Sequence, residues 1–113
     1  MKKHTDVWQG TLSLMILKTI DTMGPLHGYG VARRIEQTSD HLLTINYGTL
    51  YPQLRKLERE GHLIATWGVS QKGQKAKFYR LTRSGRQRLK RAAEEWEDAH
   101  VILAKFLTPE ASS

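Results

Sequence analysis

The chain has 113 residues, no cysteine and a formal net charge of +7, which suits one small cytoplasmic domain and excludes disulfide bridges and thiolate metal sites. The charge is polarised, because residues 51–91 carry twelve Lys or Arg and two acids while residues 92–113 carry one Lys and five acids, so we expect a polyanionic partner. No apolar run reaches the roughly 18 residues of a membrane span and a signal peptide is not indicated, so no membrane partner is expected.

Two helices are predicted in the first 40 residues. Residues 11–23 are apolar at a helical period, and Gly24-Pro25 ends them. Residues 26–30 indicate a tight connection, and residues 31–37 a shorter second helix that Ser39-Asp40-His41 breaks. We interpret the connection as a turn that positions the second helix, with Gly28 and Gly30 relieving backbone strain.

A catalytic role is not indicated anywhere in the chain. His27 has no cysteine, serine or aspartate motif around it that would make it a general base or activate a nucleophile. The five histidines have no metal-ligand spacing, and a phosphate-binding loop is not evident. We therefore expect no enzyme activity, no cofactor and no metal site.

The third helix carries an apolar stripe at positions 50, 54 and 57 and ends at Gly61. Its start is left open by Pro52, which lacks an N–H and is tolerated best in a first turn. Either the cap lies near Gly48 or Thr49, or the helix begins at Asn46 and bends at Pro52.

Two strand patterns follow, at residues 62–67 and 76–81, joined by about eight residues rich in Gly, Ser, Gln and Lys. Alternation places Leu63, Ala65 and Trp67 on one face of the first strand. A helix that offers hydroxyls and cations, followed by a basic hairpin, is the element order of a winged helix-turn-helix that binds duplex DNA. The predicted fold is therefore mainly α with a small β-wing.

A last helix over residues 83–107 completes the predicted fold. It has apolar residues spaced 3, 4, 3, 4, 3, at Leu89, Ala92, Trp96, Ala99, Leu103 and Phe106. Its length of about 37 Å exceeds a body of about 30 Å, so a second copy of the chain is the simplest partner. The alternative is a monomer whose last helix folds back on the first. We expect a DNA-binding domain at residues 1–82, a dimerisation helix at 83–107 and a flexible tail at 108–113.

Five separated blocks in this order resemble the PadR family of bacterial transcription regulators. They are Gly10-Thr11-Leu12 with Leu14, then residues 24–30, then residues 48–52, then Leu54, Leu57, Glu58 and Gly61, and finally Tyr79-Arg80-Leu81-Thr82 with Gly85. The resemblance covers about residues 10–107. It implies a winged-helix homodimer that binds operator DNA, usually as a repressor, in the branch with a single long dimerisation helix. Some members of the family are released from DNA by phenolic acids or planar aromatic drugs, so the resemblance raises the hypothesis of such an effector.

The candidate DNA contacts lie on the third helix and the hairpin. Hydroxyls, amides and the helix N-terminus suit phosphates and base edges, and hairpin lysines suit phosphates or a minor groove. The candidates are Tyr47, Thr49, Tyr51, Pro52, Gln53, Arg55, Lys56, Lys72, Lys75 and Lys77. Packing inside the domain remains the alternative for Tyr51, and a solvated face is favoured for Arg59.

An aromatic effector, if one exists, is expected between Trp8, Trp96 and their symmetry mates, although Trp96 is interpreted first as a core residue of the dimer seam. Two other functions remain open. One is a winged-helix adaptor whose basic face binds an acidic protein, and the other is a non-specific nucleic-acid or RNA-binding protein. A basic surface without any partner is the simplest alternative.

Overall fold

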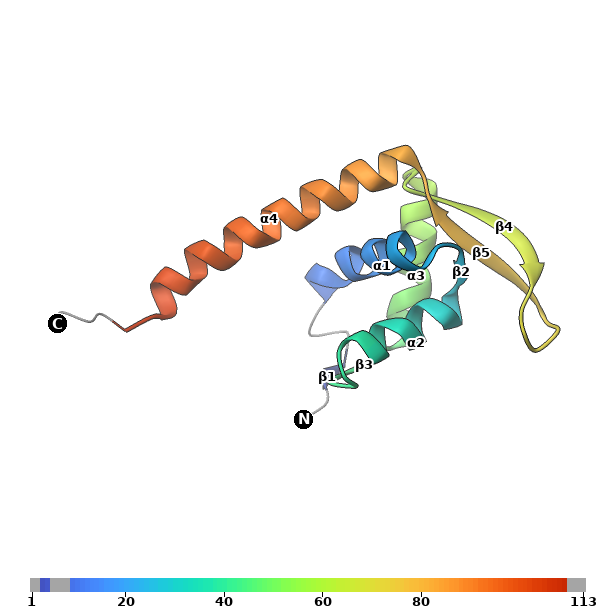
Figure 1. The fold of residues 1–113 in the computed structure, drawn as a ribbon, viewed down its shortest axis with the longest axis horizontal. Helices are drawn as coiled ribbons and strands as arrows, with labels where there is room; N and C mark the ends of the chain where they lie inside the picture. The colour runs from blue at the N-terminus through green and yellow to red at the C-terminus, as the bar shows by residue number, and fades with distance from the viewer. Residues whose placement is uncertain (1–2, 5–8, 110–113) are drawn as a thin grey trace.

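The computed structural model describes residues 3–4 and 9–109, with side chains from residue 11 onward. Within this part of the chain the elements are β1 (Lys3–His4), α1 (Gln9–Met23), β2 (Leu26–His27), α2 (Gly28–Thr38), β3 (Leu43–Thr44), α3 (Tyr47–Arg59), β4 (Leu63–Val69), β5 (Lys75–Leu81) and α4 (Arg83–Leu107). Figure 1 shows α1, α2 and α3 gathered in one body, from which the β4–β5 hairpin and α4 extend in opposite directions.

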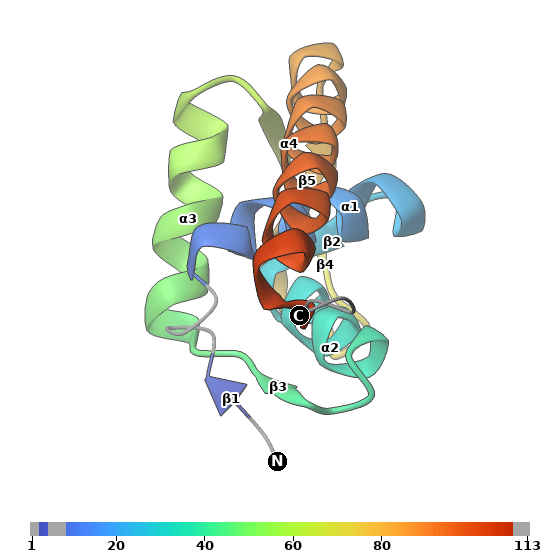
Figure 2. The same cartoon turned by 90° about the vertical axis from the view of Figure 1, so that its left-hand side faces the viewer.

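The strands form two small sheets. β2, β5 and β4 are antiparallel in that order, with Leu26 opposite Tyr79 and Leu63 opposite Leu81. The hairpin is therefore anchored on the domain through β2, and β4 is its free edge. β1 and β3 pair in parallel, near the N-terminal end of the chain in Figure 2.

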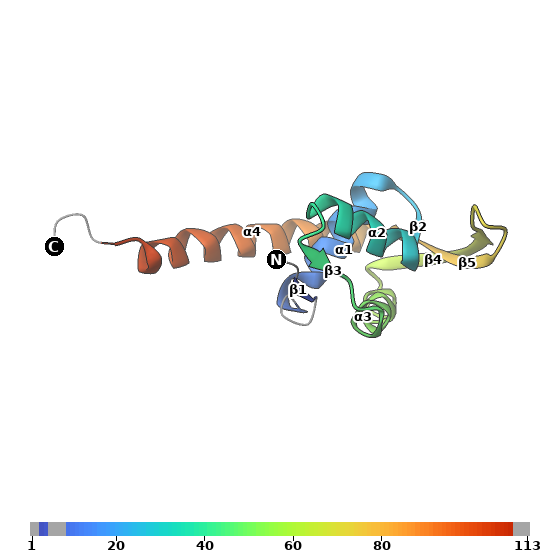
Figure 3. The same cartoon turned by 90° about the horizontal axis from the view of Figure 1, so that it is seen from below.

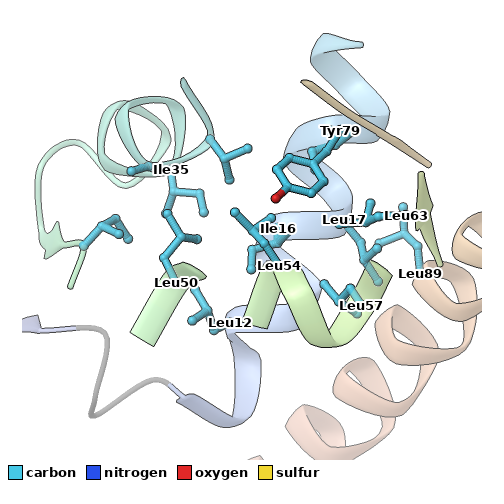
Figure 4. Packing of buried hydrophobic residues seen from close by; sticks show 14 residues of the cluster. Leu12, Ile16, Leu17, Ile35, Leu50, Leu54, Leu57, Leu63, Tyr79 and Leu89 are labelled. Carbon is cyan, nitrogen blue, oxygen red and sulfur yellow. The ribbon is translucent and has the colours of Figure 1, made fainter. Parts of the chain in front are cut away.

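One hydrophobic core joins α1, α2, α3 and the base of the hairpin. The apolar stripe of α3 is buried against α1, and Figure 4 shows Leu50 and Leu54 facing Leu12 and Ile16. Leu89 of α4 closes the core beside Leu63 and is only 9% exposed. The first turns of α4 are consequently part of the domain that precedes them.

The second helix begins earlier than residue 31, because His27 caps it. The His27 Nδ1 atom accepts the backbone N–H of Gly30 at 2.9 Å, so α2 starts at Gly28. Neither Gly28 nor Gly30 has a positive φ, and the prediction that they relieve backbone strain is wrong. A β-carbon on Gly28 would lie 2.5 Å from Cε1 of Tyr51, so this glycine allows α2 and α3 to approach closely.

The third helix begins at Tyr47, with Asn46 as its N-cap. The Asn46 side chain accepts the N–H of Gly48 at 2.8 Å. Pro52 lies inside the helix, where it cannot donate to the carbonyl of Gly48. At the other end Gly61 has a φ of +82°, and the N–H of His62 bonds back to Leu57 at 2.9 Å. This left-handed glycine ends α3 as the sequence predicts.

The hairpin loop is shorter than predicted, because both strands extend further toward its tip. Residues 70–74 form the loop, in which the Ser70 N–H donates to Gln74 at 2.8 Å and Gly73 adopts a φ of +78°. Strand pairing continues to Val69 and Lys75. The wing is therefore an ordered ladder almost to its end.

The last helix packs on α1 with its first turns and then leaves the domain, so its C-terminal half does not fold back on α1. Thr82 caps it, because its Oγ1 accepts the N–H of Gly85 at 3.0 Å. Figure 3 shows the C-terminal half of α4 projecting alone, on the side opposite the wing. The principal extents of 62 × 32 × 21 Å reflect this projection. Among the described helices, none has the length and apolar character that crossing a membrane requires.

Candidate nucleic-acid interface

Three tyrosines form a continuous aromatic surface across the N-termini of α2 and α3. The rings of Tyr29 and Tyr47 are stacked at 6.5 Å with an interplanar angle of 17°, and those of Tyr47 and Tyr51 are 5.9 Å apart. All three side chains are exposed, by 45% for Tyr29, 42% for Tyr47 and 37% for Tyr51. The three rings thus contact one another while each side chain remains partly exposed to solvent.

Two cations border this surface and come from different elements. Nη1 of Arg33 donates to the Tyr29 hydroxyl at 3.1 Å, and its guanidinium lies 5.8 Å from the ring centroid. The ammonium of Lys72, at the wing tip, lies 5.9 Å from the same ring. Tyr29 therefore links α2 to the wing. We define the polyanion face as Tyr29, Arg33, Tyr47, Tyr51 and Lys72.

Tyr47 keeps its phenolic proton in this setting. Burial raises its pKa above the ordinary value of 10.0, and the carboxylate of Glu36 adds to the rise. The guanidinium of Arg33 acts in the opposite direction but is outweighed. The hydroxyl of Tyr47 is therefore a hydrogen-bond donor at neutral pH, as a phosphate ligand must be.

Two of the predicted contact residues are engaged inside the domain. Nε2 of Gln53 donates to Oγ of Ser13 at 2.6 Å, which ties α3 to α1. Nζ of Lys77 pairs with Oε1 of Glu58 at 3.0 Å, and this hydrogen bond raises the pKa of Lys77. Both side chains thus position α3, one relative to α1 and the other relative to the wing.

The remaining predicted contacts lie at the surface of α3 and the wing. Pro52, Arg55 and Lys56 are exposed on α3, Thr49 is half-buried in its first turn, and Lys75 is exposed on the wing. Arg59 is also exposed, near the C-terminal end of α3. Hydroxyls and cations from α2, α3 and the wing therefore face outward from adjoining elements, an arrangement that can hold an extended anion.

The same fold is found in known transcription regulators. The sequence pattern of the transcriptional regulator PadR-like family matches residues 16–91, about two thirds of the chain. The chain belongs to this family. The resemblance and the winged-helix fold expected from the sequence are both confirmed. PadR-like proteins are DNA-binding regulators of transcription and not enzymes.

Individual relatives match over nearly their whole length. A transcriptional regulator from Clostridium thermocellum has a TM-score of 0.82 and 29% identity, over 92% of this chain and 97% of its own. A PadR-family transcriptional regulator from Eggerthella lenta has a TM-score of 0.77 and 28% identity, over 93% and 88%. A protein of Lysinibacillus sphaericus, described as uncharacterised, is 28% identical over 92% of this chain and 94% of its own.

In this PadR-like chain, the predicted dimerisation seam divides into two parts. Leu89 is buried in the core of its own domain and Ala92 is half-buried. The later members are uncovered, with exposed fractions of 45% for Trp96, 57% for Leu103 and 79% for Phe106, and Ala99 is exposed as well. Val101, Ile102 and Leu107 are also at least half exposed. The apolar end of α4 is therefore available to a partner.

Two hollows adjoin α4. A groove of about 830 Å³ lies between α1, α4 and the C-terminal end of α2, and Leu14, Met15, Ile35, Leu89 and Ala93 are among its apolar lining residues. A smaller hollow of about 440 Å³ lies along α4 at Trp96, whose ring is stacked on that of His100 at 5.1 Å. Trp8, the other predicted wall of an effector site, lies outside the described residues. The described residues contain no group of three or more His, Asp or Glu that would hold a metal ion.

The sequence offered only weak signals for part of the polyanion face. The sequence places Tyr29 in the connection before the second helix and Arg33 on that helix, and neither residue is among the predicted DNA contacts. Tyr29 and Arg33 are four residues apart, so a helix places them on one side. This spacing is the signal in the sequence that the two side chains lie together. The sequence alone does not show that Lys72 of the wing lies close to the Tyr29 ring.

Proposed function

We propose that this PadR-like chain is a repressor that binds an inverted-repeat operator as a homodimer. The observation that supports this best is the polyanion face, because it presents phenolic donors and cations from α2, α3 and the wing. In this proposal α3 enters a major groove and the wing lies over the neighbouring backbone. Bound protein then blocks the promoter.

The contact residues have different roles in this proposal. Tyr47, Tyr51 and Thr49 donate to phosphates, while Pro52 fits against the sugar–phosphate backbone. Arg55 and Lys56 extend along the groove, and their cations reach base edges or phosphates. Lys72 and Lys75 contact phosphates from the wing. Gln53 and Lys77 act through their bonds to Ser13 and Glu58 by fixing α3.

Replacing Arg55 by alanine tests the role of α3. We expect the affinity for a selected operator to fall by about 1–3 kcal/mol, with relaxed preference at one base position, if the guanidinium contacts a base edge. A loss that is equal on all sequences would indicate a phosphate contact instead. The measurement is fluorescence anisotropy with operator and scrambled duplexes. Arg91→Ala, which removes an equal charge from α4, is the control and should change neither value. An unchanged affinity for Arg55→Ala would refute the proposed orientation.

The homodimer is supported by the uncovered apolar end of α4. In an antiparallel pair of α4 helices, the partner's apolar Leu103-to-Leu107 end lies beside the first turns of α4. There it can fill the apolar groove between α1, α2 and α4. Residues 1–82 with the first turns of α4 form the DNA-binding head, and the rest of α4 is the dimerisation segment.

The proposal includes a spacing for the two heads, taken from twofold dimers of this architecture. Two recognition helices related by a twofold axis meet half-sites about 34 Å apart on one face of DNA. An effector between the α4 helices would alter the angle between the heads and thereby the fit to both half-sites. If operator affinity were unchanged by every ligand that binds the protein, this coupling would be refuted.

We further propose that the hollow at Trp96 accepts a planar aromatic effector once a second chain covers it. The stacked pair of Trp96 and His100 supplies a flat wall, and Ala99 and Leu103 supply apolar flanks. Titration with a panel of planar aromatics should quench the Trp96 emission and should fail to do so in Trp96→Phe. Absence of quenching in the wild type and in a Trp8→Phe variant would refute the effector site.

A further inference from the structure

One large aromatic side chain on the wing is left uncovered by the domain. Trp67 is 61% exposed, and Val69 beyond it is 70% exposed. Both follow Leu63 and Ala65 on the same face of β4, because side chains alternate along a strand. Leu63 is only 2% exposed, so this face leaves the core as the strand runs outward. Trp67 and Val69 therefore form an apolar spot on the outer part of the wing that the domain does not cover.

The face that carries Trp67 looks toward α3. Lys77 lies directly opposite Trp67 in the ladder, and its ammonium reaches Glu58 of α3 at 3.0 Å. Directly opposite residues of an antiparallel pair project to the same side. The indole therefore stands on the side of the wing that faces α3, further out toward the tip.

The surroundings of the indole are cationic. The ammonium of Lys75 lies 5.2 Å from the Trp67 ring centroid. Residues 63–81 contain Lys72, Lys75, Lys77 and Arg80 and no acidic residue. A second copy of this strongly basic wing is thus an unfavourable neighbour, and an anionic surface is a favourable one. The α4 end that serves the proposed dimer projects from the opposite side of the domain (Figure 3).

We propose that Trp67 contacts the minor groove of operator DNA, with its ring against deoxyribose and base edges beside the major groove that α3 enters. Lys75 holds the indole in place and contacts the adjoining phosphate. Apolar side chains serve this purpose in proteins that bind the minor groove. This inference rests on the proposed function and adds to it a contact without charge.

The salt dependence of binding separates this contact from an electrostatic one. Each phosphate contact that is lost lowers the slope of log affinity against log salt by about one. We expect Trp67→Ala to weaken operator binding about tenfold or more with an unchanged slope. Lys75→Ala should reduce the slope by about one. Ile64→Ala is the matched control, because Ile64 is 50% exposed on the other face of the same strand, and it should change neither quantity.

A second readout does not depend on the alanine variant being folded. In a Trp8→Phe, Trp96→Phe background, Trp67 is the remaining indole of the three. Operator DNA should protect its emission from acrylamide, and random DNA should protect it less. An affinity unchanged in Trp67→Ala, or an indole that stays equally quenchable on the operator, overturns the inference, as does a change of oligomeric state in Trp67→Ala. Absence of selective binding by the wild type refutes the proposed function itself.

Discussion

Replacing Leu103 and Phe106 together by glutamate is expected to convert the protein from a dimer to a monomer and to weaken operator binding by about 100-fold or more. Both side chains are exposed in the single chain, by 57% and 79%, and both belong to the predicted seam. In the proposed dimer they are buried against the partner, where an unpaired carboxylate is strongly unfavourable. The loss of operator affinity follows because two linked heads bind far more tightly than one.

The matched control for this pair is Lys105→Glu. It changes the net charge by the same two units within the same turn of α4, but it does not replace an apolar seam residue. Sedimentation equilibrium gives the mass of each variant, and anisotropy gives its affinity for the operator. A wild-type protein that is monomeric at micromolar concentration, or a double variant that remains dimeric, would contradict the proposed interface.

The Gly85→Ala variant is expected to lose about 3 kcal/mol or more of folding stability. A β-carbon at this position would lie within van der Waals overlap of the His62 carbonyl oxygen and 3.0 Å from its carbon. That carbonyl is fixed, because it accepts the N–H of Thr82 at 3.2 Å. Relief of the overlap must move α4 away from the end of α3 and disturb the Thr82 cap. Urea unfolding followed by circular dichroism measures the change.

Ser84→Ala is the control for this substitution. It adds no atoms to the junction and removes only the exposed hydrogen bond between Ser84 Oγ and His62 Nδ1, so we expect a loss of about 0.5 kcal/mol or less. If Gly85→Ala unfolds at the same urea concentration as Ser84→Ala, the close approach of α4 to His62 is not tight in solution. In that case the packing of α4 described above is wrong.

Local pattern was sufficient to predict the order of the four helices and the β4–β5 hairpin and the main buried stripe, but not the two-residue strands β1, β2 and β3. The period of α3 identifies its buried leucines, and Gly61 marks its end, because both depend on the local backbone. The pattern of α4 also separated apolar from charged positions. It did not show that Leu89 packs in its own domain, because a helical seam does not specify which surface covers each turn.

Pattern alone failed where the role of a side chain depends on a distant element. Gln53 and Lys77 looked like surface polar residues, but Ser13 and Glu58 engage them. Gly28 looked like a strained turn residue, but the Tyr51 ring is the reason for a glycine there. Alternation predicts the face of β4 that carries Trp67, and the structure shows that this face extends beyond the core.

Selection of bound duplexes from a random pool, with purified protein at about 150 mM salt so that non-specific phosphate attraction is reduced, tests the central claim most directly. The dimeric regulator proposed here predicts enrichment of an inverted repeat whose half-site centres are separated by about one helical turn. Salt-sensitive binding to all duplexes, without enrichment of any sequence, would contradict it.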